Sequence, residues 1–364
     1  KLLNTSVYRD YFTHLFAHKL DEIFSKTTPD GQTSLQPVSW DYRFSNLCNF
    51  KCRMCGDMLS SSWETEQRTH GMVDYSNPKN NWMQPNIRHA IQSFQDDQVE
   101  AEFAAAVESH RVEEVYWVGG EPLMYEQHWR YMKRIVELGD GPRLYARYNT
   151  NLSRVTYRGV DLYSDILSNI RDWQICASLD GTNRIGEYIR TGLDYEQFCR
   201  NFEAGLEIAT HPRQMRLDFT LTLPGMFEVD AMERLPQTYG VQLLAKVIFS
   251  FTPDIIMSPL ALPRKILERK IEEIIPGTTG ALRDVLNQLG TRPTFAEQWP
   301  DTYRNTLVLA KERVEQIESI RRDQLTLRDI LSEDPEMVRS FQKHEDIHAS
   351  TAAKVFNVAQ RSYA

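Results

Sequence analysis

Three cysteines lie close together in the first sixth of the chain, at Cys48, Cys52 and Cys55. Their spacing is C-x3-C-x2-C, which places three thiols on one short loop. Cysteine thiolates hold iron–sulfur clusters, and a cubane held by protein alone takes four of them. Three thiolates would hold three corners and leave the fourth iron open to another ligand. The loop therefore predicts an iron site at which chemistry can begin.

A structural zinc site is the alternative for closely spaced cysteines, and it needs four Cys or His ligands. The two remaining cysteines, Cys176 and Cys199, are 23 residues apart and form no second pair. Cys176 is expected to be a small core residue in a strand, and Cys199 to lie in a helix. A radical-relay role for either cysteine is the less favoured hypothesis. The loop favours a cluster over zinc.

Strands and helices alternate along the chain after this loop. Strands are expected at residues 115–118, 143–148, 174–178, 216–223 and 245–251, and helices between them at, for example, 127–138 and 195–209. Such alternation predicts a parallel sheet built from βα units. Polar and glycine-rich runs follow the strands, at the edge where parallel α/β sheets and barrels bind ligands.

The polar runs come in a defined order. Gly119-Gly120-Glu121-Pro122 follows the first of these strands, Asn149-Thr150-Asn151-Leu152-Ser153 the second, and Ser178-Leu179-Asp180-Gly181 the third, with Arg190 shortly after. Together with the cysteine loop, this order resembles the radical S-adenosylmethionine (radical SAM) superfamily. It is most similar to the branch that carries SPASM or twitch extensions, and the resemblance covers roughly residues 38 to 260.

The resemblance implies a fold and a set of cofactor ligands. The fold is a partial parallel (β/α)6 barrel, and the cofactors are one [4Fe–4S] cluster and SAM, which chelates the fourth iron. The three cysteines would hold the cluster. The expected SAM contacts are Gly119, Gly120 and Glu121 for the methionine amino group, Asn149, Asn151, Ser178 and Asp180 for the ribose and sulfonium end, and Arg190 for the carboxylate. Glycines allow a close approach, and a carboxylate pairs with an ammonium group.

The implied activity is reductive cleavage of SAM to a 5′-deoxyadenosyl radical, which abstracts hydrogen from a substrate. The cofactor carries that chemistry, so no catalytic side chain is assigned. Tyr125 and Tyr148 could donate a hydrogen atom or serve only for packing. The first substrate hypothesis is a peptide or protein side chain. A small metabolite, a nucleoside-type substrate, or a non-catalytic SAM-binding barrel are the alternatives. An external electron donor of the flavodoxin or ferredoxin type is expected.

Two features depart from the SPASM/twitch pattern. No cysteine occurs after residue 200, so a single cluster is predicted, and any twitch-like extension must lack one. The stretch between Cys55 and Gly119 is also long, with an insertion at about 60–97 that contains Trp63, Tyr75 and Trp82. Long segments in compact domains are often functional. The insertion is either a surface excursion with a short helix or a lid over the barrel mouth.

The chain divides into three expected parts. Residues 1–37 form a helix, at about 5–26, and a linker; residues 38–260 form the barrel; residues 261–364 form a helical extension with an apolar stripe at Leu307, Val314 and Ile317. The extension contains His344-Glu345-Asp346-Ile347-His348, the H-E-x-x-H pattern of zinc peptidases. No His, Asp or Glu follows it as a third ligand, so a charged helical face is the favoured interpretation.

Composition fits a cytoplasmic enzyme. Lys plus Arg is 42 and Asp plus Glu is 50, a net charge of −8, so binding of nucleic acid through bulk charge is not expected. No apolar run is long enough to span a membrane, and no signal peptide is visible. Five cysteines, three of them assigned to the cluster, suit a reducing compartment.

Overall fold

The computed structural model describes residues 15–248 and 254–339. The first part of the expected helix at 5–26, the end of the expected strand at 245–251 and the H-E-x-x-H pattern at 344–348 lie outside the described residues.

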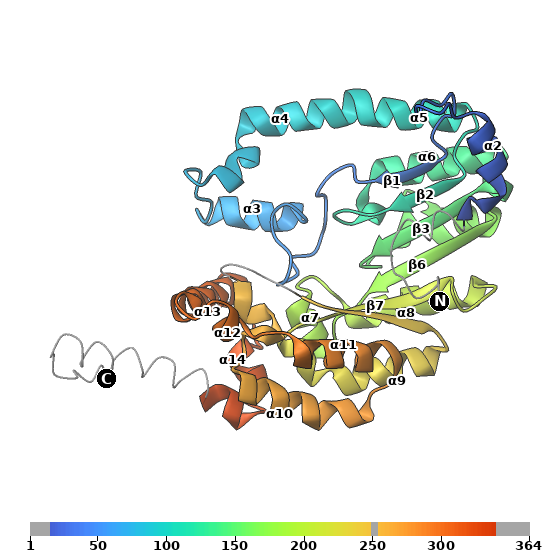
Figure 1. Cartoon of the computed structure of the whole chain (residues 1–364). Helices are drawn as coiled ribbons and strands as arrows, with labels where there is room; N and C mark the ends of the chain where they lie inside the picture. The colour runs from blue at the N-terminus through green and yellow to red at the C-terminus, as the bar shows by residue number, and fades with distance from the viewer. Residues whose placement is uncertain (1–14, 249–253, 340–364) are drawn as a thin grey trace, which may run out of the picture.

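A six-stranded sheet forms the centre of the molecule (Figure 1), with strand order β1-β2-β3-β6-β7-β8 and parallel pairing throughout. The strands are β1 (Ser39–Tyr42), β2 (Glu114–Trp117), β3 (Tyr145–Thr150), β6 (Asp172–Ser178), β7 (Met215–Leu221) and β8 (Gln242–Val247). Helices connect successive strands, as parallel pairing requires. The expected parallel (β/α)6 arrangement is confirmed, and β1, for which the sequence pattern offered no bounds, completes it.

Helices account for most of the remaining described chain. They are α2 (Leu20–Ser25), α3 (Ser61–Thr69), α4 (Pro85–Phe94), α5 (Glu100–Glu108), α6 (Glu126–Glu137), α7 (Asn183–Ile189), α8 (Tyr195–Ile208), α9 (Val229–Tyr239), α10 (Arg264–Ile274), α11 (Gly280–Thr291), α12 (Phe295–Gln298), α13 (Tyr303–Arg321) and α14 (Leu327–Leu331). A small hairpin of β4 (Thr156–Tyr157) and β5 (Val160–Asp161) follows β3.

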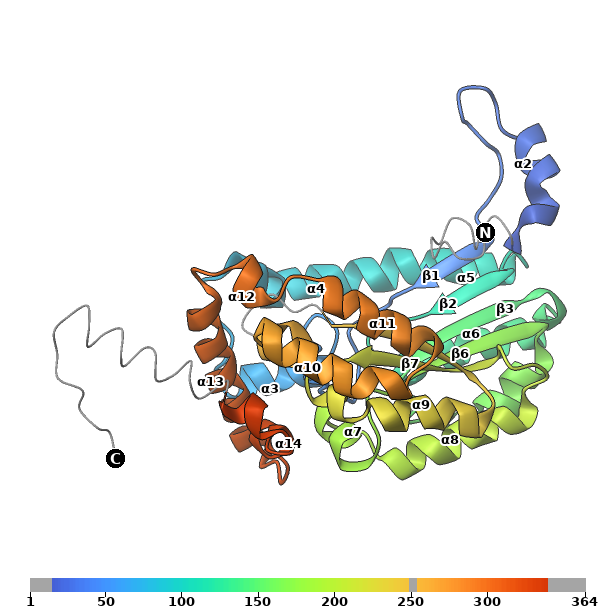
Figure 2. The same cartoon turned by 60° about the horizontal axis from the view of Figure 1, so that its bottom comes forward.

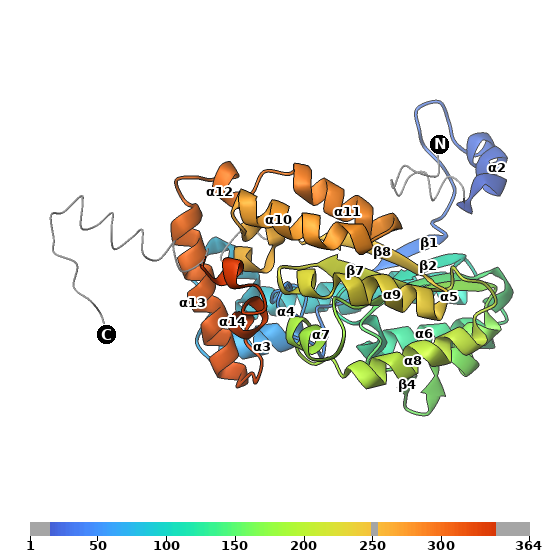
Figure 3. The same ribbon diagram turned by 90° about the horizontal axis from the view of Figure 1, so that it is seen from below.

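The two faces of the sheet differ in chemistry, because side chains alternate along each strand. In β3, Ala146, Tyr148 and Thr150 are buried, whereas Tyr145, Arg147 and Asn149 are partly exposed. Helices α5, α6, α8 and α9 pack on the first, apolar face; Trp117 of β2, for example, meets Phe103 of α5 edge to face. Figure 3 shows α6 and α8 on one side of the sheet and α10 and α11 on the other.

The insertion after the cysteine loop is more helical than an irregular excursion with one short helix. It contains α3 and α4, and α4 runs on toward α5 above α3 (Figure 1). The side chain of Trp63 in α3 is buried, whereas α4 buries no residue and exposes Ile91 and Phe94. The end of the insertion nearest the cysteines is thus part of the core, and α4 is not.

The N-terminal and C-terminal parts differ in how much of their apolar surface is buried. Helix α2 and the segment after it project away from the sheet (Figure 2), and Leu20 and Phe24 are exposed, so this end of the expected amphipathic helix packs little apolar surface. In contrast, Leu307, Val314 and Ile317 of α13 are buried, which confirms the expected stripe. None of the described helices has the length and apolar character that crossing a membrane would require.

Candidate functional site

The cysteine loop lies between β1 and α3 and is held from two sides. Its backbone pairs with the segment after α7: Lys51 N donates to Thr191 O at 2.8 Å, and Arg53 N to Ile189 O at 2.8 Å. Helix α3 holds it from the other side, where Ser62 Oγ donates to Cys48 O at 2.7 Å and Trp63 Nε1 donates to Cys52 O at 2.7 Å. The loop is therefore fixed by the protein's own hydrogen bonds.

The three cysteine thiols face one region and are largely shielded from water. Cys52 is buried, Cys48 and Cys55 are half-buried, and the thiols of Cys52 and Cys55 are hydrogen-bonded to each other. Burial raises the pKa of Cys48 to about 12. Hydrogen bonding to Cys55 lowers the pKa of Cys52. Within the described ranges, no three His, Cys, Asp or Glu side chains are arranged to hold a single metal ion. Three neighbouring thiols have the donor chemistry that an iron–sulfur cubane needs.

The turn of Gly119, Gly120 and Glu121 lies directly against this loop. Gly119 and Gly120 have φ of 85° and 51°, a region that favours glycine. A Cβ on Gly120 would lie 2.4 Å from Leu47 O, and Glu121 N donates to the same oxygen at 2.7 Å. Only glycine fits at position 120, because the residue before Cys48 approaches its backbone so closely.

The Glu121 carboxylate is buried and joins the ends of β2 and β3. It accepts hydrogen bonds from Thr150 Oγ1 at 2.6 Å, Asn151 N at 2.6 Å and Leu123 N at 3.0 Å. Burial raises the pKa of Glu121 to about 7, although these donors oppose the shift. A carboxylate has about four acceptor sites, so these three bonds leave room for one further donor.

The two asparagines expected at the SAM site contact different parts of the protein. Asn151 donates to Asn49 Oδ1 at 3.0 Å and so ties the end of β3 to the cysteine loop. Asn149 lies within β3 on its partly exposed face, where it accepts from Tyr116 Oη at 3.0 Å and donates to Asp218 Oδ2 at 3.3 Å. The role of Asn49 carried no signal in the sequence, since it lies between two cysteines without a motif of its own.

A buried ion pair connects the end of β6 to the cysteines. Arg190 Nε lies 2.6 Å from Asp180 Oδ2, and Arg190 Nη1 is 3.9 Å from Cys52 Sγ. Asp180 also accepts from Thr220 N at 2.7 Å. Burial raises the pKa of Asp180, and the Arg190 guanidinium opposes that shift. Ser178, at the end of β6, is partly exposed, and Asp218 is its neighbour in register.

The eleven expected site residues gather at the carboxyl ends of β1, β2, β3 and β6 and in the segments that follow these strands. Several residues that hold them together were not expected from the sequence. These are Asn49, Thr150 and Thr220, together with Ser61 and Ser62 of the first turn of α3.

Two tyrosines considered as hydrogen donors have structural partners. Tyr125 is buried, and its hydroxyl contacts Ser45 O at 2.6 Å and also Gly119 O. Tyr148 faces the helix-covered side of the sheet, where its hydroxyl is 3.1 Å from His128 Nε2. Both serve packing, so the hypothesis of a hydrogen-donor role for Tyr148 receives no support from its position.

Cys176 is buried, as expected, but its surroundings are not apolar. It lies on the partly exposed face of β6, between Asn149 of β3 and Arg216 of β7 in register. Burial raises the pKa of Cys176 to about 11, with Asp218, Arg216, Arg147 and Lys246 as its charged neighbours. The expectation of a small buried residue in a strand is confirmed. The sequence pattern did not show that it would lie on the face that carries these charged side chains.

A chain of polar contacts crosses this face of the sheet, which we call the polar face. Glu114 of β2 bonds Arg147 Nε of β3 at 2.7 Å, and Asp218 of β7 bonds Lys246 of β8 at 2.7 Å. Arg216 Nε is buried, and no described residue offers it a hydrogen-bond acceptor. The interiors of closed (β/α)8 barrels are packed with branched apolar side chains, so this face differs from a packed interior.

The sequence profile of the Radical SAM superfamily matches residues 42–235, more than half of the chain. With the parallel sheet and the cysteine loop in place, this match defines the class of protein. The chain belongs to the radical SAM superfamily, whose members use a [4Fe–4S] cluster and SAM, and it is accordingly an enzyme.

Solved structures of radical SAM enzymes are similar to the chain at low identity. SuiB of Streptococcus suis bound to S-adenosylmethionine gives 15% identity and a TM-score of 0.40, over 74% of this chain and 53% of that one. anSMEcpe with bound AdoMet gives 15% identity and a TM-score of 0.43, over 66% and 60%. The chain thus spans little more than half the length of these enzymes. No curated protein matches it.

Proposed function

We propose that Cys48, Cys52 and Cys55 hold one [4Fe–4S] cluster and that the neighbouring strand ends bind SAM. A cluster held there and reduced by an external donor would supply the one electron needed to cleave SAM to methionine and a 5′-deoxyadenosyl radical, and that radical would abstract hydrogen from a substrate. The observation that carries the proposal is the contact of the cysteine loop with two SAM-type elements. Glu121 N bonds the residue before Cys48, and Arg190 lies beside Cys52 Sγ.

In this proposal, the chain's own residues bind SAM and orient it beside the cysteine loop. Gly119 and Gly120 bring backbone close to the loop, and Glu121 retains an acceptor site for the methionine ammonium. Arg190 is assigned to the SAM carboxylate, with Asp180 holding its guanidinium in place. Asn149, Asn151 and Ser178 are assigned to the ribose and sulfonium end. Asp180 was expected there too, and we give it the role of holding Arg190 because its carboxylate is buried against that guanidinium. Asn151 already contacts the loop, so its contribution is to fix the strand end.

The polar face is the proposed substrate surface. Arg216 Nε has no acceptor among the described residues, whereas Arg147 has Glu114 and Lys246 has Asp218. We therefore expect a substrate with an anionic or strongly polar group. A peptide or protein side chain remains the first substrate hypothesis, by resemblance to the SPASM/twitch branch. A small metabolite or nucleoside-type molecule is the second, and a barrel that binds SAM without turnover is the third.

The proposed chemistry places two requirements on the environment of the protein. The cluster needs an external electron donor, of flavodoxin or ferredoxin type, and a reducing, cytoplasmic environment that preserves free thiols. The five cysteines are all free in the structure. We assign the helical region after β8 to a twitch-like extension without a cluster.

The test is anaerobic reconstitution with iron and sulfide, followed by incubation with SAM and a strong reductant. The product 5′-deoxyadenosine, measured by mass spectrometry, is expected. A cluster-loaded chain that binds SAM and yields none, with or without peptide and metabolite pools, would support the non-catalytic barrel. Pools of acidic, neutral and basic peptides then separate the substrate hypotheses, and Arg216→Gln is expected to remove any preference for the acidic pool.

A further inference from the structure

The end of α13 meets the cysteine loop although the two are far apart in sequence. Arg321 Nη1 donates to Lys51 O at 3.0 Å, across 270 residues, and Arg53 pairs with Asp323 across the same separation. Lys51 and Arg53 flank Cys52 directly. The C-terminal region is thus bonded to the backbone and side chains on both sides of an expected cluster ligand.

Arg321 is the centre of this contact. Its side chain is 2% exposed and its guanidinium bonds Glu66 Oε2 at 2.8 Å and Thr191 Oγ1 at 3.0 Å. The guanidinium also lies over the ring of Trp63, 4.5 Å from the centroid, and Trp63 donates to Cys52 O. One side chain therefore joins α3, the segment after α7 and the loop itself. These are the elements that hold Cys48 and Cys52.

Arg53 makes the second buried contact. Its side chain is 3% exposed, its Nε donates to Tyr188 O at 2.9 Å, and its guanidinium lies 3.7 Å from the centroid of the Tyr188 ring. Asp323 neutralises it from beyond the end of α13, and Glu318 of α13 accepts from Tyr188 Oη at 2.7 Å. The charge of Arg53 stays buried beside Cys52 because the end of α13 and the residues after it supply its partner.

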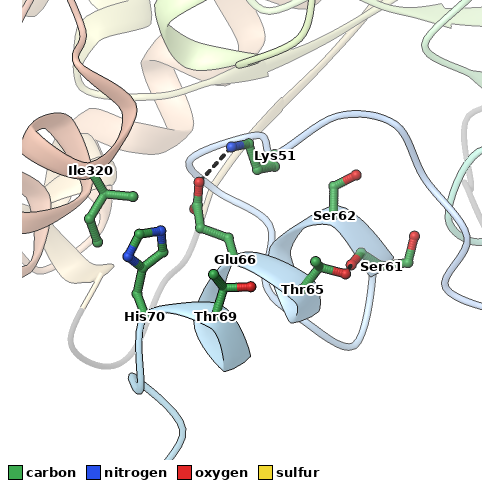
Figure 4. A pocket seen from close by; sticks show the side chains of 8 residues that line it. All are labelled: Lys51, Ser61, Ser62, Thr65, Glu66, Thr69, His70 and Ile320. Carbon is green, nitrogen blue, oxygen red and sulfur yellow. Dashed lines mark hydrogen bonds and ion pairs between the residues drawn. The ribbon is translucent and has the colours of Figure 1, made fainter.

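Figure 4 shows the solvent side of the same region. A pocket of about 420 Å³ lies between α3 and the end of α13, with Ile320 on one wall and the Lys51–Glu66 ion pair on another. Glu66, which lines this pocket, is also bonded to Arg321. Solvent reaches Lys51, which is 30% exposed, but not Arg321.

We propose that Arg321 and Asp323 are positioning residues for the cluster, so that the C-terminal region is part of the cluster-binding machinery. The inference rests on the proposed function of the three cysteines. Hydrogen bonds and charges around metal ligands orient them and tune the bound group, and their loss weakens metal binding by about 10- to 100-fold. Buried cations beside a cluster also favour the reduced state, which carries one more electron.

The test compares Arg321→Met with Arg304→Met, a matched change at an exposed position near the start of the same helix. Both proteins are reconstituted anaerobically with iron and sulfide, and the wild-type chain is carried alongside. We expect Arg321→Met to lose iron to a chelator about tenfold faster than wild type, in line with the loss of an outer contact. We also expect a more negative cluster potential, measured by redox titration with electron paramagnetic resonance. Arg304→Met should match wild type in both.

The variant Arg321→Lys tests whether a positive charge at this position is sufficient or whether the several hydrogen bonds of the guanidinium are needed. Lysine can pair with Glu66 but cannot hold Lys51 O and Thr191 as a fork, so partial recovery is expected. If Arg321→Met does not fold, as judged by circular dichroism, Asp323→Asn replaces it: the shape is kept and the charge opposite Arg53 is removed. A folded variant with wild-type iron retention and wild-type potential would overturn the inference. A wild-type chain that holds no cluster would instead contradict the proposed function.

Discussion

At the scale of single residues, the proposed cluster site makes a direct prediction. The variant Cys48→Ala, Cys52→Ala, Cys55→Ala should hold no cubane after anaerobic reconstitution, because all three thiolates are removed. A double variant of Cys176 and Cys199 to alanine is the control and should keep the cluster, since Cys199 lies on α8 and Cys176 on the polar face. Absorbance near 400 nm and iron content measure both. A cubane that survives in the triple variant would reveal another ligand set.

Glu121 makes a prediction about pH. Burial raises the pKa of Glu121 to about 7, above an unfolded value of about 4.3, so the folded chain holds this proton more tightly. The contribution of Glu121 to stability is therefore fully present below about pH 4 and is lost as pH rises through about 7. The total change is about 4 kcal/mol, because each tenfold difference in proton affinity between the folded and unfolded chain corresponds to about 1.4 kcal/mol.

Urea unfolding of the cluster-free chain at pH 5 and pH 8 measures this effect. Other groups titrate over the same range, so the comparison is with Glu121→Gln, which cannot lose a proton. The difference in unfolding free energy between the two pH values should be smaller in the variant by about 2–3 kcal/mol. An equal pH dependence in both proteins would show that Glu121 is ionised throughout.

At the scale of elements, the turn after β2 and the cysteine loop act as one unit. Gly120→Ala would place a Cβ 2.4 Å from Leu47 O, at a φ of 51°. We expect a folded protein that has lost most SAM cleavage, because the loop before Cys48 must move. Gly139→Ala is the matched control: its φ is 77°, but nothing lies within 4 Å of the added carbon.

Both glycine variants carry a backbone penalty of about 1–2 kcal/mol. Thermal unfolding should therefore shift to lower temperature in both proteins, and further in Gly120→Ala because of the added contact with Leu47 O. Circular dichroism should show both to be folded at the assay temperature, and 5′-deoxyadenosine yield should fall only in Gly120→Ala. Equal activity in the two variants would show that the contact with Leu47 is dispensable.

The elements themselves were largely predictable from the sequence. Residues 115–118 are an apolar run and 216–223 alternate polar and apolar residues. Strands lie there and at 174–178, with bounds shifted by one or two residues. β1 offered no usable signal because Ser39–Tyr42 alternates polar and aromatic residues over only four positions. The helices of the insertion were not predicted in detail, although Ile87, Ile91 and Phe94 of α4 recur at helical spacing.

The sequence predicted which strand ends contribute residues to the site. It did not predict which of these side chains bond each other. Motif order identified the residues Glu121, Asp180 and Arg190. It could not show that Asp180 pairs with Arg190 beside Cys52, or that Asn49 binds Asn151, because these contacts depend on the register of neighbouring strands. The charged neighbours of Cys176 were not predictable for the same reason, because the face that a strand residue occupies follows from the whole sheet.

At the scale of the whole molecule, the number of clusters is the testable quantity. Since no cysteine follows residue 200, the reconstituted chain should contain about four iron and four sulfide per chain, in line with one cubane. Iron analysis against a protein concentration from amino-acid analysis gives the value. About eight iron per chain would mean a second cluster with other ligands.

The contact between α13 and the cysteine loop joins two segments that are translated at very different times. Arg321 and Asp323 are added about 270 residues after the loop they hold, so the loop has emerged from the ribosome long before its partners exist. Domains form from the N-terminal side during translation, and the sheet of residues 39–247 can therefore assemble first. The buried charges of Glu66 and Arg53 acquire these partners only when α13 is complete. If Arg321 and Asp323 hold the cluster loop as proposed, iron–sulfur loading of this chain would be completed only after translation has passed residue 323.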